Sequence, residues 1–599
     1  MTSFEIERLS FSTAQQKVWA ESDERHRNWP VVYTIDSGST GAQEIYVGES
    51  LNVASRMRQH QQTGTKSHLT DVRLVIDETF NKSAALDLES YLIRFLAGDG
   101  RFRVLNRNDG ITDAEYFGRQ GYQATFAEIF DELFQQGLFT RTIPEIVNSD
   151  LFKLSPFKSL NVDQAAAVED ILEGLFADLR SHTASMSVIQ GDPGTGKTIV
   201  AIYLMKLIRD IADSTGAEDL DADSVFSEFF LGDSPKLLRD LRIGLVVPQQ
   251  SLRKSIERVF KRTPGLTTTR VMTPFEVGGD PGHFDLLIVD EAHRLNQRAN
   301  QASGPLNKKF TEITEALFGS NDLHKTQLDW ILEKSTHQIF LLDAAQSVRP
   351  ADLPPAAVEK LVATAQSSYR LYPLTSQMRV AGGSDYIEYV GRILSDERPR
   401  PEAFDNYDFR LFDDLADLRD ELAEREAQFG LARLVAGYAW PWNSKKDSAA
   451  TDIEIDGIEL QWNQTQKDWI NSSTSVFEVG SIHTVQGYDL NYAGVIIGPD
   501  LRFDVEQDRI MFDRAHYFDK KGKENNPALG LTYSDEDLLQ LVRNIYRVLL
   551  TRGMRGTYVY VCDEPLREHL RQLFVSPSKR ARTANLVTEA QESAPHIQG

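Results

Sequence analysis

Three things that this sequence lacks narrow its class before any motif is considered. A single cysteine, Cys562, stands among 599 residues, which excludes an intramolecular disulfide and a thiolate metal site. No apolar run approaches the roughly 18 residues that a membrane helix needs, and the polar N-terminus has no apolar signal-peptide core. We therefore expect a cytoplasmic chain that does not contact a membrane.

Positive charge is the third scarcity. The 65 Lys and Arg residues face 88 Asp and Glu residues, which gives a formal net charge of −23. A chain this acidic does not coat nucleic acid by bulk attraction, so any such contact has to be local. Local groups of basic residues are present, although each is more typical of solvated surface: Arg56, Arg58, Lys66 and Arg73; Arg253, Lys254, Arg258, Lys261 and Arg262; Lys579, Arg580 and Arg582.

Length and composition predict several folded units of the α/β class. Hydrophobic residues at 41% and charged residues at 26% are ordinary for a globular protein, and the length suggests roughly three or four domains. The alternation of strand-like and helix-like segments predicts this division: an N-terminal segment, 1–28; a small α/β domain, 29–110; a helical linker, 111–158; an α/β domain, 159–372, with insertions near 209–240 and 295–335; a second, 373–575, with an insertion near 400–470; and a disordered tail, 576–599.

The most specific local pattern is a phosphate-binding string, Gly-x-x-x-x-Gly-Lys-Thr. It follows an apolar strand-like run and precedes a helix-like run, which is the context the motif requires. Backbone N–H groups of such a turn point at phosphates, the lysine adds a positive charge, and the threonine hydroxyl ligates Mg²⁺. The string predicts a site for ATP and Mg²⁺ at Gly191, Asp192, Gly194, Thr195, Gly196, Lys197 and Thr198.

Two carboxylates follow a second buried run. The apolar residues 286–289 lead directly into Asp290 and Glu291, which places both side chains at the C-terminal end of a strand, where ligands of open α/β sheets bind. We expect Asp290 to hold Mg²⁺ through water and Glu291 to orient and deprotonate the attacking water. A surface turn is the alternative explanation of these letters, and the apolar run before them disfavours it.

With these motifs in place, residues 159–575 resemble superfamily 1 helicases, which implies two RecA-like parallel-sheet motor domains. Gln164 resembles the glutamine that reads adenine, and Gln346, in Asp343-Ala344-Ala345-Gln346, resembles the sensor of the γ-phosphate. The segment 483–489 resembles the element that couples the nucleotide to the bound strand, with Asp489 where many relatives carry glutamate. The sequence of residues 546–552 is similar to that of bacterial DNA/RNA helicases related to the Schlafen carboxy-terminal motor.

The same resemblance implies arginines that enter the cleft from the second motor domain. Phosphoryl transfer develops charge on the γ-phosphate oxygens, so a guanidinium from another domain makes hydrolysis depend on domain closure. Arg552 is the first candidate for this role and Arg379 the second. Arg547 and Arg555 are more typical of structural or strand-facing residues.

The first α/β domain resembles the GIY-YIG nucleases over residues 29–110. Val31-Val32-Tyr33 stands for the first triad without its glycine or isoleucine, and Tyr46-Val47-Gly48 for the second. The residues that match the family's other functional positions are Arg56, His60, Glu89 and Asn106, and His68 lies near a position that some members use. Individually, all of these are ordinary strand, surface or helix residues.

The resemblance implies how such a site cuts a phosphodiester. Tyr33 is the expected base for water, with help from Tyr46 or His60, and Arg56 neutralises the pentacovalent phosphate. Glu89 is the expected ligand of a catalytic Mg²⁺ or Mn²⁺. A folded but inactive domain that only binds nucleic acid remains the alternative.

Together the two motif sets predict an ATP-dependent nuclease-helicase that acts on nucleic acid, with DNA favoured and RNA as the alternative. Four tryptophans in the predicted insertion, Trp440, Trp442, Trp462 and Trp469, are either base-stacking surfaces or core. The rival functions are an ATP-switched binding or signalling protein and an ATP-driven remodeller of proteins. Defence against foreign DNA is the role suggested by resemblance, with repair as the alternative.

Overall fold

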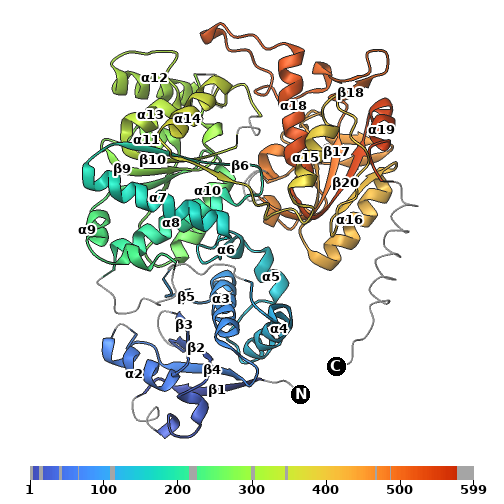
Figure 1. The fold of residues 1–599 in the computed structure, drawn as a ribbon. Helices are drawn as coiled ribbons and strands as arrows, with labels where there is room; N and C mark the ends of the chain where they lie inside the picture. The colour runs from blue at the N-terminus through green and yellow to red at the C-terminus, as the bar shows by residue number, and fades with distance from the viewer. Residues whose placement is uncertain are drawn as a thin grey trace.

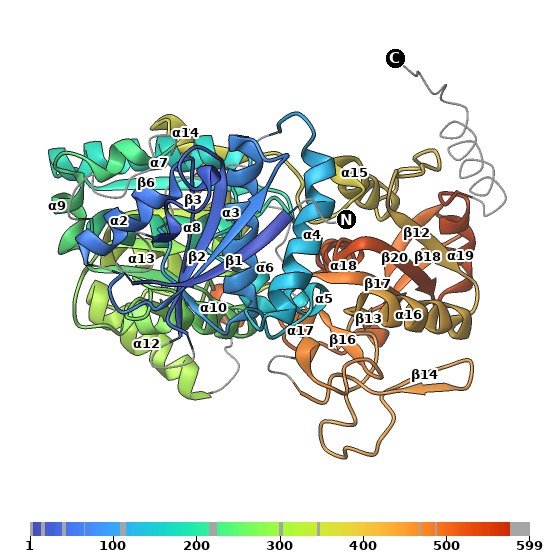
Figure 2. The ribbon, with the colours of Figure 1, turned by 90° about the horizontal axis from the view of Figure 1, so that it is seen from below.

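Three α/β units, each built on its own sheet, lie around a short helical connector (Figure 1). The computed structural model describes residues 4–12, 18–38, 43–64, 66–107, 115–214, 225–298, 304–343, 348–465, 469–485 and 488–575. Seen from below, helices α5 and α6 lie between the N-terminal unit and the second parallel unit (Figure 2). Within the described ranges, no helix is long and apolar enough to span a bilayer.

The N-terminal unit is a five-stranded sheet with helices α2 (Val53–Thr63), α3 (Lys82–Asp99) and α4 (Arg119–Gln135). All neighbouring strands are antiparallel except the last pair, and their order is β1 (Phe4–Ser10), β4 (Asp71–Asp77), β2 (Val31–Asp36), β3 (Glu44–Ser50) and β5 (Arg103–Val104). Asn52 caps α2 by accepting a hydrogen bond from Ser55 N at 2.9 Å. Strands and helices thus combine in this unit, as the α/β class expected for residues 29–110 requires.

The sheet starts earlier than the sequence suggested. β1 lies within residues 1–28, which were predicted as a separate segment, and it pairs along its full length with β4 at the sheet edge. Half-buried Phe4 and Ile6 pack into one hydrophobic cluster and half-buried Leu9 into another, with charged residues between them, so the apolar pattern of this strand is weak in the sequence. The same segment contains the 3₁₀ turn η1 (Glu24–His26).

The first parallel unit confirms the predicted alternation of strands and helices. Its sheet is wholly parallel, in the order β11 (Leu371–Leu374), β6 (Ser185–Gly191), β10 (Ser335–Leu342), β9 (Phe284–Val289), β7 (Ile243–Val246) and β8 (Arg270–Met272). Its helices are α7 (Val162–Ser181), α8 (Lys197–Ala212), α9 (Ser234–Arg239), α10 (Gln250–Arg262), α11 (Pro274–Gly278), α12 (Gly304–Phe318), α13 (Gln327–Lys334) and α14 (Pro355–Ser367). Helices α9, α12 and α13 fall in the predicted insertions.

The second parallel unit has the strand order β12 (Asp408–Phe412), β20 (Gly553–Val561), β17 (Leu490–Ile497), β13 (Ala432–Ala436) and β16 (Val479–Ser481). Two antiparallel hairpins extend from it, β14 (Ile453–Ile455) with β15 (Ile458–Leu460) and β18 (Leu501–Asp504) with β19 (Arg509–Phe512). Its helices are α15 (Gly383–Ile393), α16 (Leu415–Phe429), α17 (Ile482–Val485), α18 (Asp535–Leu550) and α19 (Glu564–Arg571).

The charge-rich stretch predicted as an insertion near 400–470 is largely part of this sheet. β12, α16 and β13 all lie within it, and two of their strands pair with the central strands. The charges of α16 obscured its role, because they occupy its outer face while Leu418 and Leu422 pack directly over Gly494 of β17. Only the part around the β14–β15 hairpin leaves the sheet.

Two tryptophans of this stretch, Trp462 and Trp469, belong to the core, so the base-stacking interpretation is wrong for these two. Trp462 and Trp469 are fully buried, and Tyr438 stacks on Trp462 with ring centroids 5.3 Å apart. The indole N–H of Trp469 donates to Glu478 at 2.8 Å. Trp440 and Trp442 are partly buried against the same cluster.

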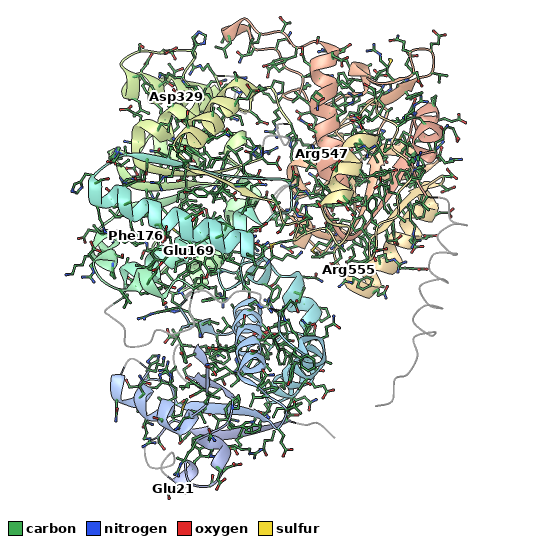
Figure 3. All side chains as sticks on the ribbon, viewed as in Figure 1. Glu21, Glu169, Phe176, Asp329, Arg547 and Arg555 are labelled. Carbon is green, nitrogen blue, oxygen red and sulfur yellow. The ribbon has the colours of Figure 1, made fainter. Side chains whose placement is uncertain are left out.

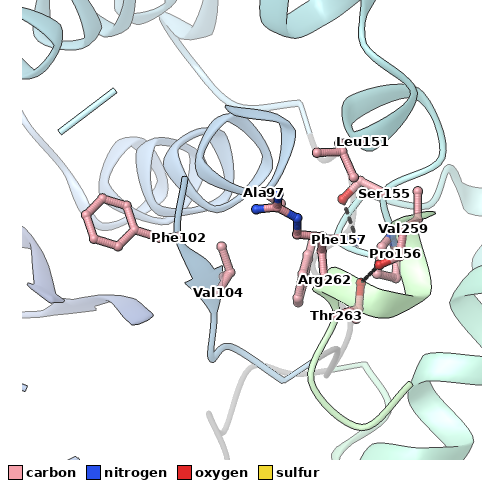
Figure 4. A pocket seen from close by; sticks show the side chains of 10 residues that line it. All are labelled: Ala97, Phe102, Val104, Leu151, Ser155, Pro156, Phe157, Val259, Arg262 and Thr263. Carbon is pink, nitrogen blue, oxygen red and sulfur yellow. Dashed lines mark hydrogen bonds between the residues drawn. The ribbon is translucent and has the colours of Figure 1, made fainter. Parts of the chain in front are cut away.

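Residues 142–158, called the connector below, join the three units. They contain α5 (Ile143–Asn148) and α6 (Asp150–Lys153), which pack against the C-terminal end of α3. Gly98 of α3 makes this packing possible, because a Cβ there would lie 2.8 Å from Ile146 and 2.9 Å from Phe152. Side chains of α3, the connector and α10 line a small cavity at this seam (Figure 4).

Several residues that the sequence suggested as surface basic groups hold the units together instead. Arg258 of α10 pairs with Asp150 of the connector at 2.5 Å, and Arg262 donates to the carbonyl of Gly100. In the N-terminal unit, Arg73 is buried in an ion pair with Asp36. Arg73 is thus removed from the surface, whereas Arg258 and Arg262 make these contacts from exposed positions.

The packing at Gly98 gives a stability prediction. Gly98→Ala should lower the free energy of unfolding by about 1–3 kcal/mol, because the added Cβ overpacks the seam. Gly121→Ala in α4 is the matched control, since nothing lies within 4 Å of a Cβ there, and it should be neutral or stabilising by about 0.5–1 kcal/mol. Thermal unfolding of both full-length variants measures the difference, and equal midpoints would contradict the prediction.

Candidate active sites

The phosphate-binding string forms the turn between β6 and α8. Gly194 and Gly196 have φ values of +92° and +80°, a backbone region that residues with a Cβ rarely adopt. α8 begins at Lys197, and Gly196 before it offers no side-chain cap to the first N–H groups of the helix. Such a helix start attracts an anion, because its N–H groups lack intrahelical acceptors.

Lys197 is held over this turn. Its ammonium donates to the carbonyls of Gly191 at 2.6 Å and Asp192 at 2.9 Å, and it lies 3.6 Å from a carboxylate oxygen of Asp343. The hydroxyl and N–H of Thr195 also bond to the Asp192 carbonyl. The charge of Lys197 is thus positioned where phosphates would follow the turn.

The two predicted carboxylates lie beside the turn at the end of β9. The Thr198 hydroxyl donates to Asp290 at 2.7 Å, so the pair expected to hold Mg²⁺ is in contact. Burial, together with the neighbouring charge of Glu291, raises the pKa of Asp290. Burial alone would also raise the pKa of Glu291, but the close contact with His293 holds it below its usual value.

His293 orients Glu291. The backbone N–H of Asp343 donates to Nδ1 of His293 at 3.2 Å, so the ring proton of a neutral imidazole sits on Nε2. That Nε2 lies 3.0 Å from Oε2 of Glu291. Glu291 itself has a left-handed backbone with φ of +50°, which is an uncommon conformation for a residue other than glycine.

Both predicted arginines reach the cleft from the far side. Arg552 is buried and donates to the carbonyl of Tyr488 at 3.2 Å, while its Nε has no hydrogen-bond partner among the described residues. Burial, and then the charge of Arg379, lowers the pKa of Arg552 to about 9. Arg379 pairs with Asp489 at 2.5 Å, and its Nη1 also lacks a partner within the described ranges.

The residues before Arg379 rest directly on the phosphate-binding turn. Gln377 donates to the carbonyl of Pro193 at 2.7 Å, and Met378 N donates to the carbonyl of Gly194 at 3.0 Å. The turn, Asp290, Glu291 and the arginines Arg379 and Arg552 therefore lie close to one another, and this group of residues is called the nucleotide cleft below. Guanidinium nitrogens without hydrogen-bond partners, close to the start of α8, fit the phosphates of ATP.

Sequence reasoning missed Arg294, which adds a third guanidinium to the cleft. Its Nε and Nη2 are buried without a hydrogen-bond partner in the part of the chain described. Burial lowers its pKa, and the charge of Glu291 reaches it. Its position three residues after Glu291 was the one feature of the sequence that could have indicated a place near the cleft.

Two other predicted nucleotide contacts stay predictions. The amide of Gln164 is buried and donates to the carbonyl of Thr195 at 2.9 Å, while its oxygen accepts from Asn161 N at 3.2 Å. In this structure the amide therefore supports the turn, and adenine is not needed to satisfy it. Gln346 lies outside the described residues.

In the N-terminal unit, the predicted nuclease residues of β2, β3 and α2 converge. The hydroxyl of Tyr33 lies 2.8 Å from Nε2 of His60, and the ring of Tyr46 contacts His60 edge-on at 5.2 Å between centroids. Gly48 faces Tyr33 across the hairpin, and a Cβ there would lie 2.4 Å from the phenol. The glycine of the second triad thus leaves room for the tyrosine of the first.

Lys66 completes this group, although the sequence suggested only a surface basic residue. It is buried, it lies 3.1 Å from Nδ1 of His60, and its ammonium sits 3.5 Å from the ring centroid of Tyr46. An ammonium cannot accept a hydrogen bond, so it donates to Nδ1 and leaves the imidazole proton on Nε2. His60 therefore donates to the oxygen of Tyr33.

The charges of Arg56 and Glu89 also reach Tyr33. Burial, with Tyr46 and Glu89, raises the pKa of the phenol well above its usual value, and Arg56 opposes that rise. Burial and the charges of Lys66 and Arg56 lower the pKa of His60 to about 3, so this imidazole is neutral. A half-buried carboxylate beside a phenol and a guanidinium fits one protein ligand of Mg²⁺.

Two further predicted residues have structural contacts. The Asn106 amide bonds to both the N–H and the carbonyl of Val47, at 3.1 and 2.9 Å, and so fixes β3 from the loop after β5. His68 pairs with Glu44 at the start of β3, at 2.7 Å. In the second parallel unit, Arg555 covers the ring of Phe429 and Arg547 lies on α18 (Figure 3).

Comparison with known proteins identifies the motor half. A sequence model of the Schlafen group 3 DNA/RNA helicase domain matches residues 184–563, more than half of the chain. An uncharacterized protein of Saccharomyces cerevisiae is 27% identical over 462 residues, which cover 71% of this chain and 93% of the yeast protein.

A solved structure of Pif1 helicase from Bacteroides, in complex with ADP-AlF3 and ssDNA, matches 70% of this chain and 97% of its own at 10% identity. Its TM-score of 0.23 is too low to carry an argument about individual residues. The family match rests instead on the sequence of the two parallel units. The chain belongs to the Schlafen group 3 DNA/RNA helicase domain family.

Proposed function

We propose that the chain is an ATP-driven helicase that moves on nucleic acid and carries a metal-dependent nuclease at its N-terminus. One observation supports the motor above all: Arg379 and Arg552 enter the cleft that Lys197 and Glu291 occupy from the opposite side. Cleft closure then controls hydrolysis, because the guanidinium groups are supplied by a second unit. DNA is the favoured polymer, and RNA is the alternative.

Each residue of the cleft has a defined task in hydrolysis. When bound, ATP with Mg²⁺ supplies the phosphoryl group that is transferred to water. Thr198 and Asp290 would hold the Mg²⁺ ion, and Glu291 would take a proton from the attacking water. Lys197, Arg379 and Arg552 neutralise the charge that develops on the phosphate oxygens.

The N-terminal site supports a matching proposal for phosphodiester cleavage. Water loses its proton to the Tyr33 oxygen and forms the new P–O bond, while the bond to the leaving oxygen breaks and that oxygen takes a proton from solvent. The His60 Nε2–H stabilises the Tyr33 phenolate that has to form first, and Arg56 neutralises the phosphate. Mg²⁺ or Mn²⁺ at Glu89 would stabilise charge on the leaving oxygen.

A second candidate function has one observation in its favour. Tyr33 and His60 are fully buried, so neither touches solvent in this structure. A domain in this state binds nucleic acid without cutting it, and the chain is then an ATP-driven motor with a nucleic-acid grip. Metal-dependent nicking of plasmid by the full-length chain distinguishes the two functions.

The biological role that these activities support is defence against foreign DNA in the cytoplasm, with DNA repair as the alternative. Loss of phage resistance on deletion of the gene supports defence. Increased sensitivity to DNA damage alone supports repair.

Replacement of Glu291 tests the motor. Glu291→Gln should lower the ATP turnover number about 10²- to 10⁴-fold and leave nucleotide binding intact, because the amide cannot accept the proton of water. Glu333→Gln, an exposed position on α13, is the matched control and should behave like the unchanged chain. ATP turnover with and without single-stranded DNA is the measurement, and turnover that persists in Glu291→Gln would remove this assignment.

Replacements in the N-terminal unit test the nuclease. Arg56→Ala and Glu89→Gln should each reduce plasmid nicking by at least about 10²-fold while ATP turnover is unchanged, because they remove charge stabilisation at the phosphate. Arg58→Ala is the matched control, since Arg58 is exposed on the same helix. Equal nicking by all three variants would refute the site.

The raised pKa of Tyr33 predicts the pH dependence of cleavage. Only the phenolate accepts the proton of water, and below the pKa its fraction grows about tenfold with each pH unit. The nicking rate should therefore climb through the neutral range into alkaline pH, without a plateau near pH 7. A rate that is flat from pH 6 to pH 9, with roughly constant metal affinity, would exclude Tyr33 as the base.

A further inference from the structure

The dipeptide Tyr488-Asp489 is the point at which both cleft arginines are held. Arg552 donates to the carbonyl of Tyr488 at 3.2 Å, and Arg379 pairs with the carboxylate of Asp489 at 2.5 Å. Asp489 is half-buried, and desolvation alone would raise its pKa, yet the charges of Arg379, Lys153 and Arg552 hold the pKa below its usual value. The carboxylate is therefore ionised and fixes the direction of Arg379.

The other side of the same dipeptide touches the connector. The ammonium of Lys153 donates to the backbone carbonyl of Asp489 at 3.0 Å. The Tyr488 hydroxyl lies 3.3 Å from Ser255 of α10, and that serine donates to Asp150 of the connector at 2.7 Å. One end of α6 is thus tied to the element that positions the arginines.

Lys153 occupies this place at an energetic cost. Burial lowers the pKa of Lys153, and it also lowers the pKa of the nearby Lys158 to about 8, with Asp489 opposing both shifts. Lys153 is half-buried, and such an ammonium keeps its charge where hydrogen bonds and charge partners compensate for the hydration it has lost. The compensating partner here, Asp489, belongs to the second parallel unit.

The connector is equally firmly attached to the N-terminal unit. Ile146 and Phe152 pack on Gly98 of α3, and Ser149 donates to the Gly98 carbonyl at 3.2 Å. α3 is the helix that carries Glu89, the candidate metal ligand of the nuclease. Beyond α5, Asn148 bonds to the carbonyl of Phe429 and accepts from Asn491, both at 3.1 Å.

We propose that Lys153 is a positioning residue for ATP hydrolysis, which holds Asp489 and through it Arg379, and that the connector transmits closure of the nucleotide cleft to α3. This inference rests on the proposed ATP-driven motor. Its physical basis is that the same short segment is bonded to Asp489 through Lys153 and packed on the C-terminal end of α3 through Ile146 and Phe152. A shift of Asp489 on closure therefore moves the helix that carries Glu89.

Kinetics of three variants test the positioning role. Lys153→Met removes the ammonium but keeps the length of the side chain, and it should lower the ATP turnover number about 10- to 100-fold at nearly constant KM, because Arg379 acts on the reacting phosphate. Lys153→Arg keeps a cationic donor and should restore much of the rate. Arg141→Met removes one exposed charge just before the connector and is the matched control.

Hydrogen exchange of the full-length chain tests the transmission. Adding a non-hydrolysable ATP analogue should slow exchange in residues 191–200 and also change exchange in residues 143–158 and in α3. In Lys153→Met the first effect should persist and the second should disappear, while thermal unfolding checks that the variant is folded.

The outcomes separate the two proposals. If the analogue leaves residues 191–200 unprotected, the ATP-binding proposal fails and this inference fails with it. If those residues are protected but the connector and α3 do not respond, only the inference is overturned. A Lys153→Met variant with normal turnover, or one that Lys153→Arg does not rescue, overturns the positioning role.

Discussion

The structure depends on the placement of three arginines in the nucleotide cleft, where the negative charges of a triphosphate would bind. Arg294, Arg379 and Arg552 all keep buried guanidinium atoms without hydrogen-bond partners among the described residues. Such atoms are costly to bury unless a ligand accepts their hydrogen bonds, and the oxygens of a triphosphate can do so. Because Arg552 comes from a different unit than Lys197, a triphosphate bound to both residues also favours closure of the two parallel units. The motor and its coupling to the rest of the chain both follow from that arrangement.

Charge also explains how an acidic chain is held together. The basic residues of α10 and of the N-terminal sheet serve internal contacts, such as Arg258 with Asp150 and Arg73 with Asp36. With a formal net charge of −23, the chain does not attract nucleic acid over its whole surface, and contact has to be confined to short stretches. The family match to DNA/RNA helicases and the acidic surface are compatible for this reason. Specific contacts, rather than a general field, have to do the binding.

The two candidate sites share a design in which a donor on Nδ1 orients an imidazole. A backbone N–H fixes His293 beside Glu291, and the Lys66 ammonium fixes His60 beside Tyr33. In each case the donor determines which nitrogen carries the proton, and so which way the imidazole can assist the reacting group. The residue that donates to Nδ1 thus sets the orientation of the imidazole, and through it the position of Glu291 or Tyr33.

The sequence by itself determined the parts of this protein whose chemistry is local. Order and spacing along the chain sufficed for the phosphate-binding turn, for Asp290 and Glu291 after β9, and for the hairpin that carries Tyr33, because those residues are positioned by their own strand and turn. Tertiary structure alone decided the rest. The role of the 400–470 stretch, the burial of its tryptophans, and the contacts of Lys66 and Lys153 each depend on which distant segment covers the residue. The sequence alone does not show whether a charged side chain will be surrounded by water or by a buried partner.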